Sequence, residues 1–190
     1  MVLFAIALAV AWRESISLFP GIAVTLRLVG LCAVVLLGTL SVAEVLLASR
    51  SPEEQKRLWV RQIIPRTPTE RAVWILSSTV AGITEETIFR GVFYTLVASL
   101  SGSIVIGAVA SAAVFAIAHY RQGRKSMLLV GLFALFFQWL VVTTGSLVPA
   151  MAVHALYDVI RGLLAGHRFE KLEQAPRFEN AEARGLSRGK

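Results

Sequence analysis

The sequence has little charge and almost no cysteine, and both shortages narrow what the chain can be. Charged residues make up 16% of its 190 residues, and apolar residues make up 56%. A soluble domain is typically about one quarter charged and about half apolar. The single cysteine, Cys32, lies inside an apolar run and excludes an internal disulfide. The composition therefore argues against a soluble domain.

The apolar residues fall in runs of the size that crosses a bilayer, for which about 20 residues are needed. The runs cover residues 28–48, 72–100, 103–119, 127–142 and 147–160. A shorter run over residues 2–12 is expected as a short helix or a trimmed end, and a signal peptide is a weak alternative because no basic residue precedes it. The sequence predicts an all-α polytopic membrane protein, a bundle of about five or six transmembrane helices.

The formal net charge is +7, but its distribution indicates a membrane topology and no nucleic-acid partner. Lys and Arg gather at residues 50–71, at 121–125 and from 161 to the C-terminus, between or after the apolar runs. The turns near Gly102 and Gly145 carry no charge. The positive-inside rule therefore predicts that all three basic segments, including the C-terminus, are cytoplasmic.

The chain is expected to have three parts. Residues 1–66 hold the N-terminal apolar segment, a transmembrane helix and a short cytoplasmic interfacial helix over about 51–64, which mixes apolar and basic residues. Residues 67–166 form the main helix bundle, whose start carries the capping-box pattern Thr67-Pro68-Thr69-Glu70. Residues 167–190 form a polar cytoplasmic tail. The helix expected over 68–100 is too long for a straight span, so it must tilt, kink or protrude.

Charged and histidine side chains are rare in the apolar runs between residues 72 and 160. Apart from the basic loop at 121–125, this stretch contains Glu85, Glu86, Arg90, His119, His154 and Asp158. A charge at membrane depth costs several kcal/mol, so such a residue marks either a functional site or a structural ion pair.

The spacing of the two carboxylates bears on whether each of them belongs to a structural ion pair or to a functional site. Glu86 and Arg90 form an i,i+4 pair, which a structural ion pair explains as well as a functional one. Glu85 lies about 100° further round the helix and cannot easily share Arg90. Two adjacent carboxylates in a low dielectric resist ionising together, so one of them is suited to accept a proton near neutral pH.

The histidines are ambiguous singly and informative together. His119 alone reads as a packing residue, and His154 with Asp158 is an i,i+4 pair in which the acid can orient the ring. Three separate apolar runs each present such groups, with little else polar around them. This favours one shared catalytic or ligand-binding site.

Three motifs in this order carry a family resemblance. Residues 85–91 read EETIFRG, residues 115–119 read FAIAH, and residues 154–158 read HALYD. They resemble the EExxxR, FxxxH and HxxxN/D motifs of the CPBP family, the CAAX proteases and bacteriocin-processing enzymes also called Abi. The resemblance covers about residues 70–166, roughly half of the chain. It implies hydrolysis of a peptide bond in a membrane-associated protein or peptide, with a prenylated substrate in the best-known members, and a prokaryotic cell membrane as the location.

The resemblance also implies residue roles. Glu85 would be the general base that activates water, and His119 would help to hold or deprotonate that water. His154 and the residue at 158 would stabilise the oxyanion. The family often has Asn at this last position, and Asp158 can donate a hydrogen bond only when protonated. Asp158 is therefore expected to orient His154 instead.

Other readings remain open. Glu86 and Arg90 are expected as the pair that fixes Glu85, with no cofactor favoured. Glu85, His119 and His154 could instead bind zinc, with water as the fourth ligand. A non-enzymatic immunity or scaffold protein is a further alternative. A transporter with a proton relay is another, although transporters usually show inverted repeats and none is evident here.

The expected depth of His154 conflicts with a straight helix. Glu85 and His119 are each about 16 residues from the turn at Gly102, whereas His154 is only about nine residues after Gly145. Either residues 143–148 dip into the protein, which is tolerated where protein surrounds the backbone, or the expected span boundaries are wrong.

Overall fold

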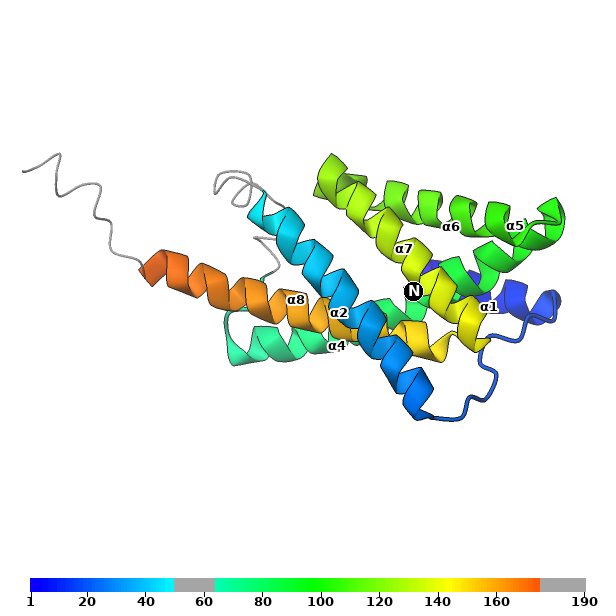
Figure 1. The fold of residues 1–190 in the computed structure, drawn as a ribbon, viewed down its shortest axis with the longest axis horizontal. Coiled ribbons are helices and arrows are strands. Elements are labelled where there is room, and N and C mark those ends of the chain that lie inside the picture. The colour runs from blue at the N-terminus through cyan, green and yellow to red at the C-terminus, as the bar shows by residue number, and fades with distance from the viewer. Residues whose placement is uncertain (50–63, 175–190) are drawn as a thin grey trace, which may run out of the picture.

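The computed structural model describes residues 1–49 and 64–174, and every regular element in this part of the chain is helical (Figure 1). The elements are α1 Val2–Arg13, α2 Leu26–Ala48, α4 Pro68–Glu86, the π-helix η2 Thr87–Phe93, α5 Tyr94–Ser101, α6 Ile104–Ala118, the short 3-10 turn η3 Tyr120–Gln122, α7 Arg124–Thr144 and α8 Val148–Gln174. The predicted all-α class is confirmed.

Three of these helices are long and apolar enough to cross a membrane: α2, α7 and the part of α8 that ends at Arg168. Helices α1 and α6 are apolar but shorter, with 12 and 15 residues. The expected interfacial helix over 51–64 lies almost entirely outside the described residues. Helix α8 extends to Gln174, so the expected boundary of the tail at 166 falls inside a helix.

The start of α4 follows from the capping box. The Thr67 side chain accepts a hydrogen bond from the Glu70 backbone N–H at 3.2 Å, and a Glu70 carboxylate oxygen accepts one from the Thr67 backbone N–H at 3.0 Å. Pro68 occupies the first helical position, where its missing N–H costs nothing. The predicted helix start is confirmed.

The long helix expected over 68–100 is interrupted by η2. A π-helix widens the helix by one residue and is a recognised cause of a kink. In Figure 1, α4 and α5 run in different directions on the two sides of η2. The helix ends at Gly102, whose φ of +66° lies in the left-handed region that glycine adopts without strain. A kink, one of the three expected alternatives, is therefore present and has a local cause.

Helices α4 and α8 cross closely, side by side along the lower edge of Figure 1. A Cβ atom on Gly82 would lie 2.9 Å from the carbonyl oxygen of Met151 and 3.1 Å from the Cβ of Ala155. Only glycine permits this approach. One end of the crossing is fixed by Trp74, whose indole N–H donates to the carbonyl oxygen of Asp158 at 3.0 Å. This crossing places the end of α4 against α8.

The turn between α7 and α8 is partly buried. Ser146 and Leu147 are only 2% and 4% exposed. Leu147 belongs to an apolar cluster with Ala7 and Ala11 of α1, and the Ser146 hydroxyl donates to the carbonyl of Pro20 at 3.4 Å. Ser146 and Leu147 are therefore covered by α1 and the residues after it, whereas Gly145 and Val148 are exposed. Which of the two expected solutions holds for the depth of His154 stays a prediction.

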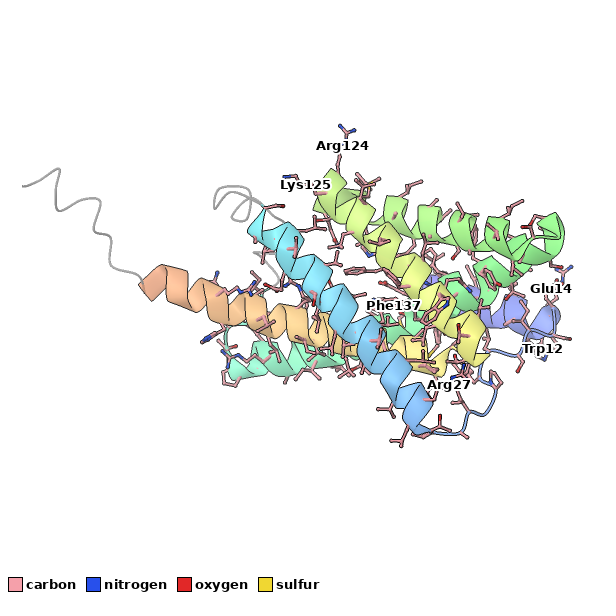
Figure 2. The ribbon with its side chains drawn as sticks, in the orientation of Figure 1. Trp12, Glu14, Arg27, Arg124, Lys125 and Phe137 are labelled. Atoms are coloured by element: carbon pink, nitrogen blue, oxygen red, sulfur yellow. The ribbon has the colours of Figure 1, made fainter. Side chains whose placement is uncertain are left out.

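Side chains at the start of α7 and in its middle have different surroundings. Figure 2 shows Arg124 and Lys125 projecting from the outer end of α7, and Phe137 among the helices. Phe137 is 2% exposed. The basic residues therefore mark an end of the bundle, and the assignment of that end to the cytoplasm stays a prediction.

Candidate active site

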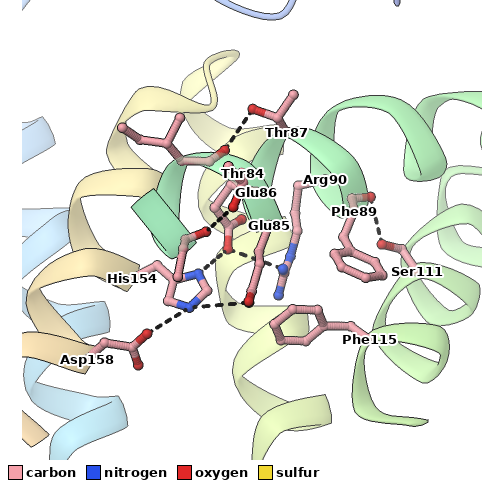
Figure 3. A network of polar contacts seen from close by, with 12 residues as sticks. Thr84, Glu85, Glu86, Thr87, Phe89, Arg90, Ser111, Phe115, His154 and Asp158 are labelled. Carbon is pink, nitrogen blue, oxygen red and sulfur yellow. Dashed lines mark hydrogen bonds and ion pairs between the residues drawn. The ribbon is translucent and has the colours of Figure 1, made fainter. Parts of the chain in front are cut away.

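The crossing of α4 and α8 brings most of the predicted site residues together (Figure 3). Glu85 and Glu86 end α4, Arg90 lies in η2, and His154 and Asp158 face them from α8. His154 is 6% exposed, and Glu86 is fully buried. The site is therefore a polar cluster enclosed by apolar helices.

Glu86 is the centre of this cluster. The ring N–H at Nδ1 of His154 donates to Oε1 of Glu86 at 2.7 Å. Nη1 of Arg90 lies 3.1 Å from the same oxygen, so the i,i+4 pair expected from the spacing is present. A buried carboxylate is tolerated only when it is paired. The contact between Glu86 and His154 was not foreseen, because helix periodicity gives no information on contacts between helices.

Glu85 has different surroundings from its neighbour. Its side chain is 31% exposed, and its Oε2 lies 3.8 Å from Nε2 of His154. The two adjacent carboxylates thus face the two nitrogens of one ring, Glu86 at Nδ1 and Glu85 at Nε2. Glu86 is enclosed and paired, whereas Glu85 remains accessible.

Asp158 is near His154 but is not its closest acid. Oδ2 of Asp158 lies 3.5 Å from Nε2, at the outer limit of a hydrogen bond. The shorter contact, from Glu86, holds the ring more tightly. Counting Arg90, the cluster carries a net charge of −2 with a neutral His154 and −1 with a doubly protonated one. A protonated ring would donate to carboxylates on both sides.

His119 is the predicted site residue that stands furthest from the others. It follows the last residue of α6, and its ring N–H at Nδ1 donates to the carbonyl of Phe115 at 2.8 Å. This leaves Nε2 as the lone-pair nitrogen. The Phe115 ring is 4.6 Å from the His119 ring and 6.3 Å from the His154 ring, centroid to centroid. Within the described residues, His119 makes no hydrogen bond to Glu85 or His154, although it is close enough to act on Glu85 electrostatically.

Two aromatic rings line the cluster. The Arg90 guanidinium carbon lies 4.2 Å from the centre of the Phe115 ring and 5.7 Å from that of Phe137. Phe137 also lies 5.3 Å from the His154 ring. Cation–π contact with two rings stabilises a buried guanidinium. Phe115 belongs to a sequence motif, but nothing in the sequence pointed to Phe137 except its neighbour Gln138, an isolated polar residue in the apolar run at 127–142.

The zinc alternative requires Glu85, His119 and His154 to surround one ion. Among the described residues, no group of three His, Cys, Asp or Glu side chains is placed to hold a metal ion. Both ring nitrogens of His154 face carboxylates, and His119 is turned toward Phe115. The proposed ligands Glu85, His119 and His154 therefore do not form a metal-binding set in the described arrangement.

Comparison with known proteins agrees with the motifs. Residues 67–160 match the family model described as Type II CAAX prenyl endopeptidase Rce1-like. No curated protein and no solved structure matches the chain significantly. The matched segment begins at the capping box of α4 and ends two residues after Asp158, so it contains all the site residues described above. The chain is thus an integral membrane protein that belongs to the Rce1-like CAAX endopeptidases, the CPBP/CAAX protease family that its motifs resemble.

Proposed function

We propose that this protein is an intramembrane endopeptidase that hydrolyses a peptide bond of a membrane-associated substrate, with Glu85 as the general base. The observation that carries the proposal is the difference between two adjacent carboxylates. Glu86 is fully buried and paired with Arg90 and His154, whereas Glu85 is 31% exposed and lies near Nε2 of the same imidazole. Glu86 fixes the positions of Arg90 and His154, and Glu85 is available for proton transfer.

The chemistry needs a water molecule within hydrogen-bond reach of the base. Glu85 takes a proton from this water, and the resulting hydroxide attacks the carbonyl carbon of the substrate. The carbonyl oxygen becomes an oxyanion, and the C–N bond then breaks. The proton held by Glu85 passes to the leaving amine, so the carboxylate is restored. His119 supports this step as an acceptor, because its lone-pair nitrogen Nε2 can hold the attacking water.

The oxyanion is stabilised by His154 in this proposal. Its ring is held at Nδ1 by Glu86 and packed against Phe137, so Nε2 is fixed on the side where Glu85 lies. A donor that is fixed before the reaction costs no reorganisation when the charge develops. Asp158, near the same nitrogen, keeps the ring oriented and protonated.

The substrate class follows from the family. The family is named for prenyl endopeptidases, so a peptide with a lipidated cysteine near its C-terminus is the first substrate to try. The bilayer would hold the lipid of such a substrate, and the peptide would reach the site from the membrane boundary. Reaction without a resident metal is part of the proposal, in line with the geometry of the histidines.

The test uses purified protein in detergent or liposomes and a farnesylated peptide, with mass spectrometry to detect a new terminus. Glu85→Gln should abolish cleavage while the protein keeps its thermal melting temperature, because the amide cannot accept a proton from water. Glu44→Gln is the matched control, since Glu44 pairs with Arg161 and Arg168 away from the cluster. A Glu85→Gln variant as active as the parent would end the proposal. A folded parent that cleaves neither lipidated nor unlipidated peptides would favour the non-enzymatic alternative.

A further inference from the structure

Gln138 of α7 is a buried polar residue that the proposed reaction does not use. It is 3% exposed, and neither its amide nitrogen nor its amide oxygen has a hydrogen-bond partner among the described residues. Buried polar side-chain atoms are nearly always hydrogen-bonded, because leaving them unpaired costs free energy. An amide with both ends unpaired among the described residues therefore lacks the partner that a buried amide ordinarily has.

The packing of α7 shows which way this residue faces. Ala134, one turn earlier on the same face of α7, packs against Ala112 and Phe115 of α6 and against Phe89 of η2. Gln138 therefore faces the region between α6, α7 and η2. The opposite side of α7, with Leu140, packs against α2 and α8.

Ser111 of α6 lies against η2, the element that Ala134 of α7 also borders through Phe89. Ser111 is 2% exposed, and its hydroxyl donates to the carbonyl of Phe89 in η2 at 2.8 Å. Its oxygen keeps lone pairs that can accept hydrogen bonds.

Arg90 borders the same region and is also incompletely paired. Its guanidinium stacks on Phe115, the ring that packs with Ala134. Nη1 lies near Oε1 of Glu86 without the alignment of a hydrogen bond, and Nη2 has no hydrogen-bond partner among the described residues. Oε2 of Glu86 also has no hydrogen-bond partner among the described residues. The unsatisfied atoms thus include donors and acceptors on adjacent elements.

We propose that Gln138, Ser111 and Arg90 enclose an internal water site between α6, α7 and η2. Water fits the chemistry, because it both donates and accepts and an internal water typically makes about three hydrogen bonds to otherwise unpaired groups. A substrate peptide does not fit, because Gln138 and Arg90 are almost completely enclosed.

This site makes Gln138 a positioning residue, in an argument that rests on the proposed function. Water bound by Gln138 would accept a hydrogen bond from the guanidinium of Arg90. Arg90 pairs with Glu86, and Glu86 in turn holds the ring of His154. Loss of the amide would leave Arg90 with fewer partners and loosen the ring. The effect should fall on turnover and not on substrate binding, because none of these groups other than His154 faces the substrate.

The first measurement needs no activity. Isotope-labelled protein in liposomes is examined by solid-state NMR for magnetisation transfer from water to side-chain nitrogens, with the Gln138 amide identified by its loss in Gln138→Leu. We expect rapid transfer from water to this amide and to the Arg90 side chain. We also expect the transfer to Arg90 to be slower in Gln138→Leu. The control is Thr39→Val, because the Thr39 hydroxyl is buried but already donates to backbone carbonyls of α2. Slow transfer to Gln138, like that to a dry core, would overturn the water site.

The second measurement is kinetic. Gln138→Leu should lower kcat about tenfold, the size expected for one lost buried hydrogen bond, with KM changed less than about twofold. Gln138→Asn keeps a donor and an acceptor that water can reach, so it should recover most of the activity. A Gln138→Leu variant with unchanged kcat would overturn the positioning role. If the parent shows water contact but cleaves nothing, the proposed function fails and the water site stands.

Discussion

Helix α8 carries two ionic clusters, and the contrast between them explains why only one is suited to chemistry. The inner cluster joins His154 to Glu86 and Arg90, with side chains that are 0–8% exposed. The outer cluster joins Arg161 and Arg168 to Glu44 of α2, with side chains 22–44% exposed. Both link α8 to another helix, but they differ in what surrounds the charges.

In the outer cluster, each arginine has a carboxylate oxygen of Glu44, and the charges are partly exposed and can be screened. In the inner cluster, removal of one partner would leave a buried charge without its partner. Buried pairs are therefore fragile to truncation, whereas exposed pairs contribute little. The inner cluster also keeps polar atoms without partners, which is typical of sites that bind something.

The largest effect is expected from truncation in the inner cluster. Arg90→Ala and Glu86→Ala should each lower the free energy of unfolding by about 3–5 kcal/mol, because each leaves an uncompensated buried charge. Denaturant or thermal unfolding in detergent measures this. The double variant should lose less than the sum of the two, since it removes both charges. A loss below about 1 kcal/mol in both single variants would place the inner pair in the same class as the outer one.

The next effect is on activity. Asp158→Asn should reduce cleavage at least about tenfold, and Asp158→Ala should reduce it further, because the change removes the charge that keeps His154 oriented and protonated. Loss of a complete oxyanion contact would cost about a hundred- to a thousand-fold, so about tenfold is the smallest effect expected. Rates on the farnesylated peptide give the answer. An Asn variant as active as the parent would show that position 158 acts only as a donor.

A smaller effect is expected in the outer cluster. Glu44→Gln should lower the free energy of unfolding by no more than about 1 kcal/mol, since the pair is partly exposed, and cleavage should stay within about twofold of the parent. The measurement is the same unfolding experiment used for Arg90→Ala. A loss as large as that of Arg90→Ala would break the comparison and show that exposure does not separate the two clusters.

No effect is expected from metal removal. Incubation with a strong chelator should leave cleavage unchanged, because Glu85 is proposed to activate water without a metal ion. Metal analysis of the purified protein is the companion measurement. Activity that is lost with chelator and restored by zinc would instead support the alternative in which Glu85, His119 and His154 are zinc ligands.

The sequence was informative wherever a local rule applied. The capping box at Thr67 and the glycine at 102 set helix ends through backbone chemistry that neighbouring residues contain. The need to bend the helix over 68–100 followed from its length against the bilayer. The pairing of Glu86 with Arg90 followed from i,i+4 spacing. In each of these cases the relevant atoms lie within a few residues of each other.

Contacts between helices were harder to predict from the sequence. The sequence suggested that Glu85, His119 and His154 would meet, but it could not show that the Phe115 ring lies beside the His154 ring. It could not reveal that Glu86 is the acid closest to His154. These contacts depend on the angle and depth at which helices cross, and periodicity along one helix fixes neither.

The sequence by itself determined that this chain is a bundle of apolar helices with acids, histidines and an arginine in a fixed order, since helix formation and membrane insertion depend on local composition. The tertiary structure alone decided which carboxylate is enclosed and which remains accessible. The physical reason is the close approach at Gly82, together with the buried turn at Ser146, which sets α8 against the end of α4. A shift of one residue in that crossing would turn α4 by about 100° relative to α8 and would move Glu86 away from His154.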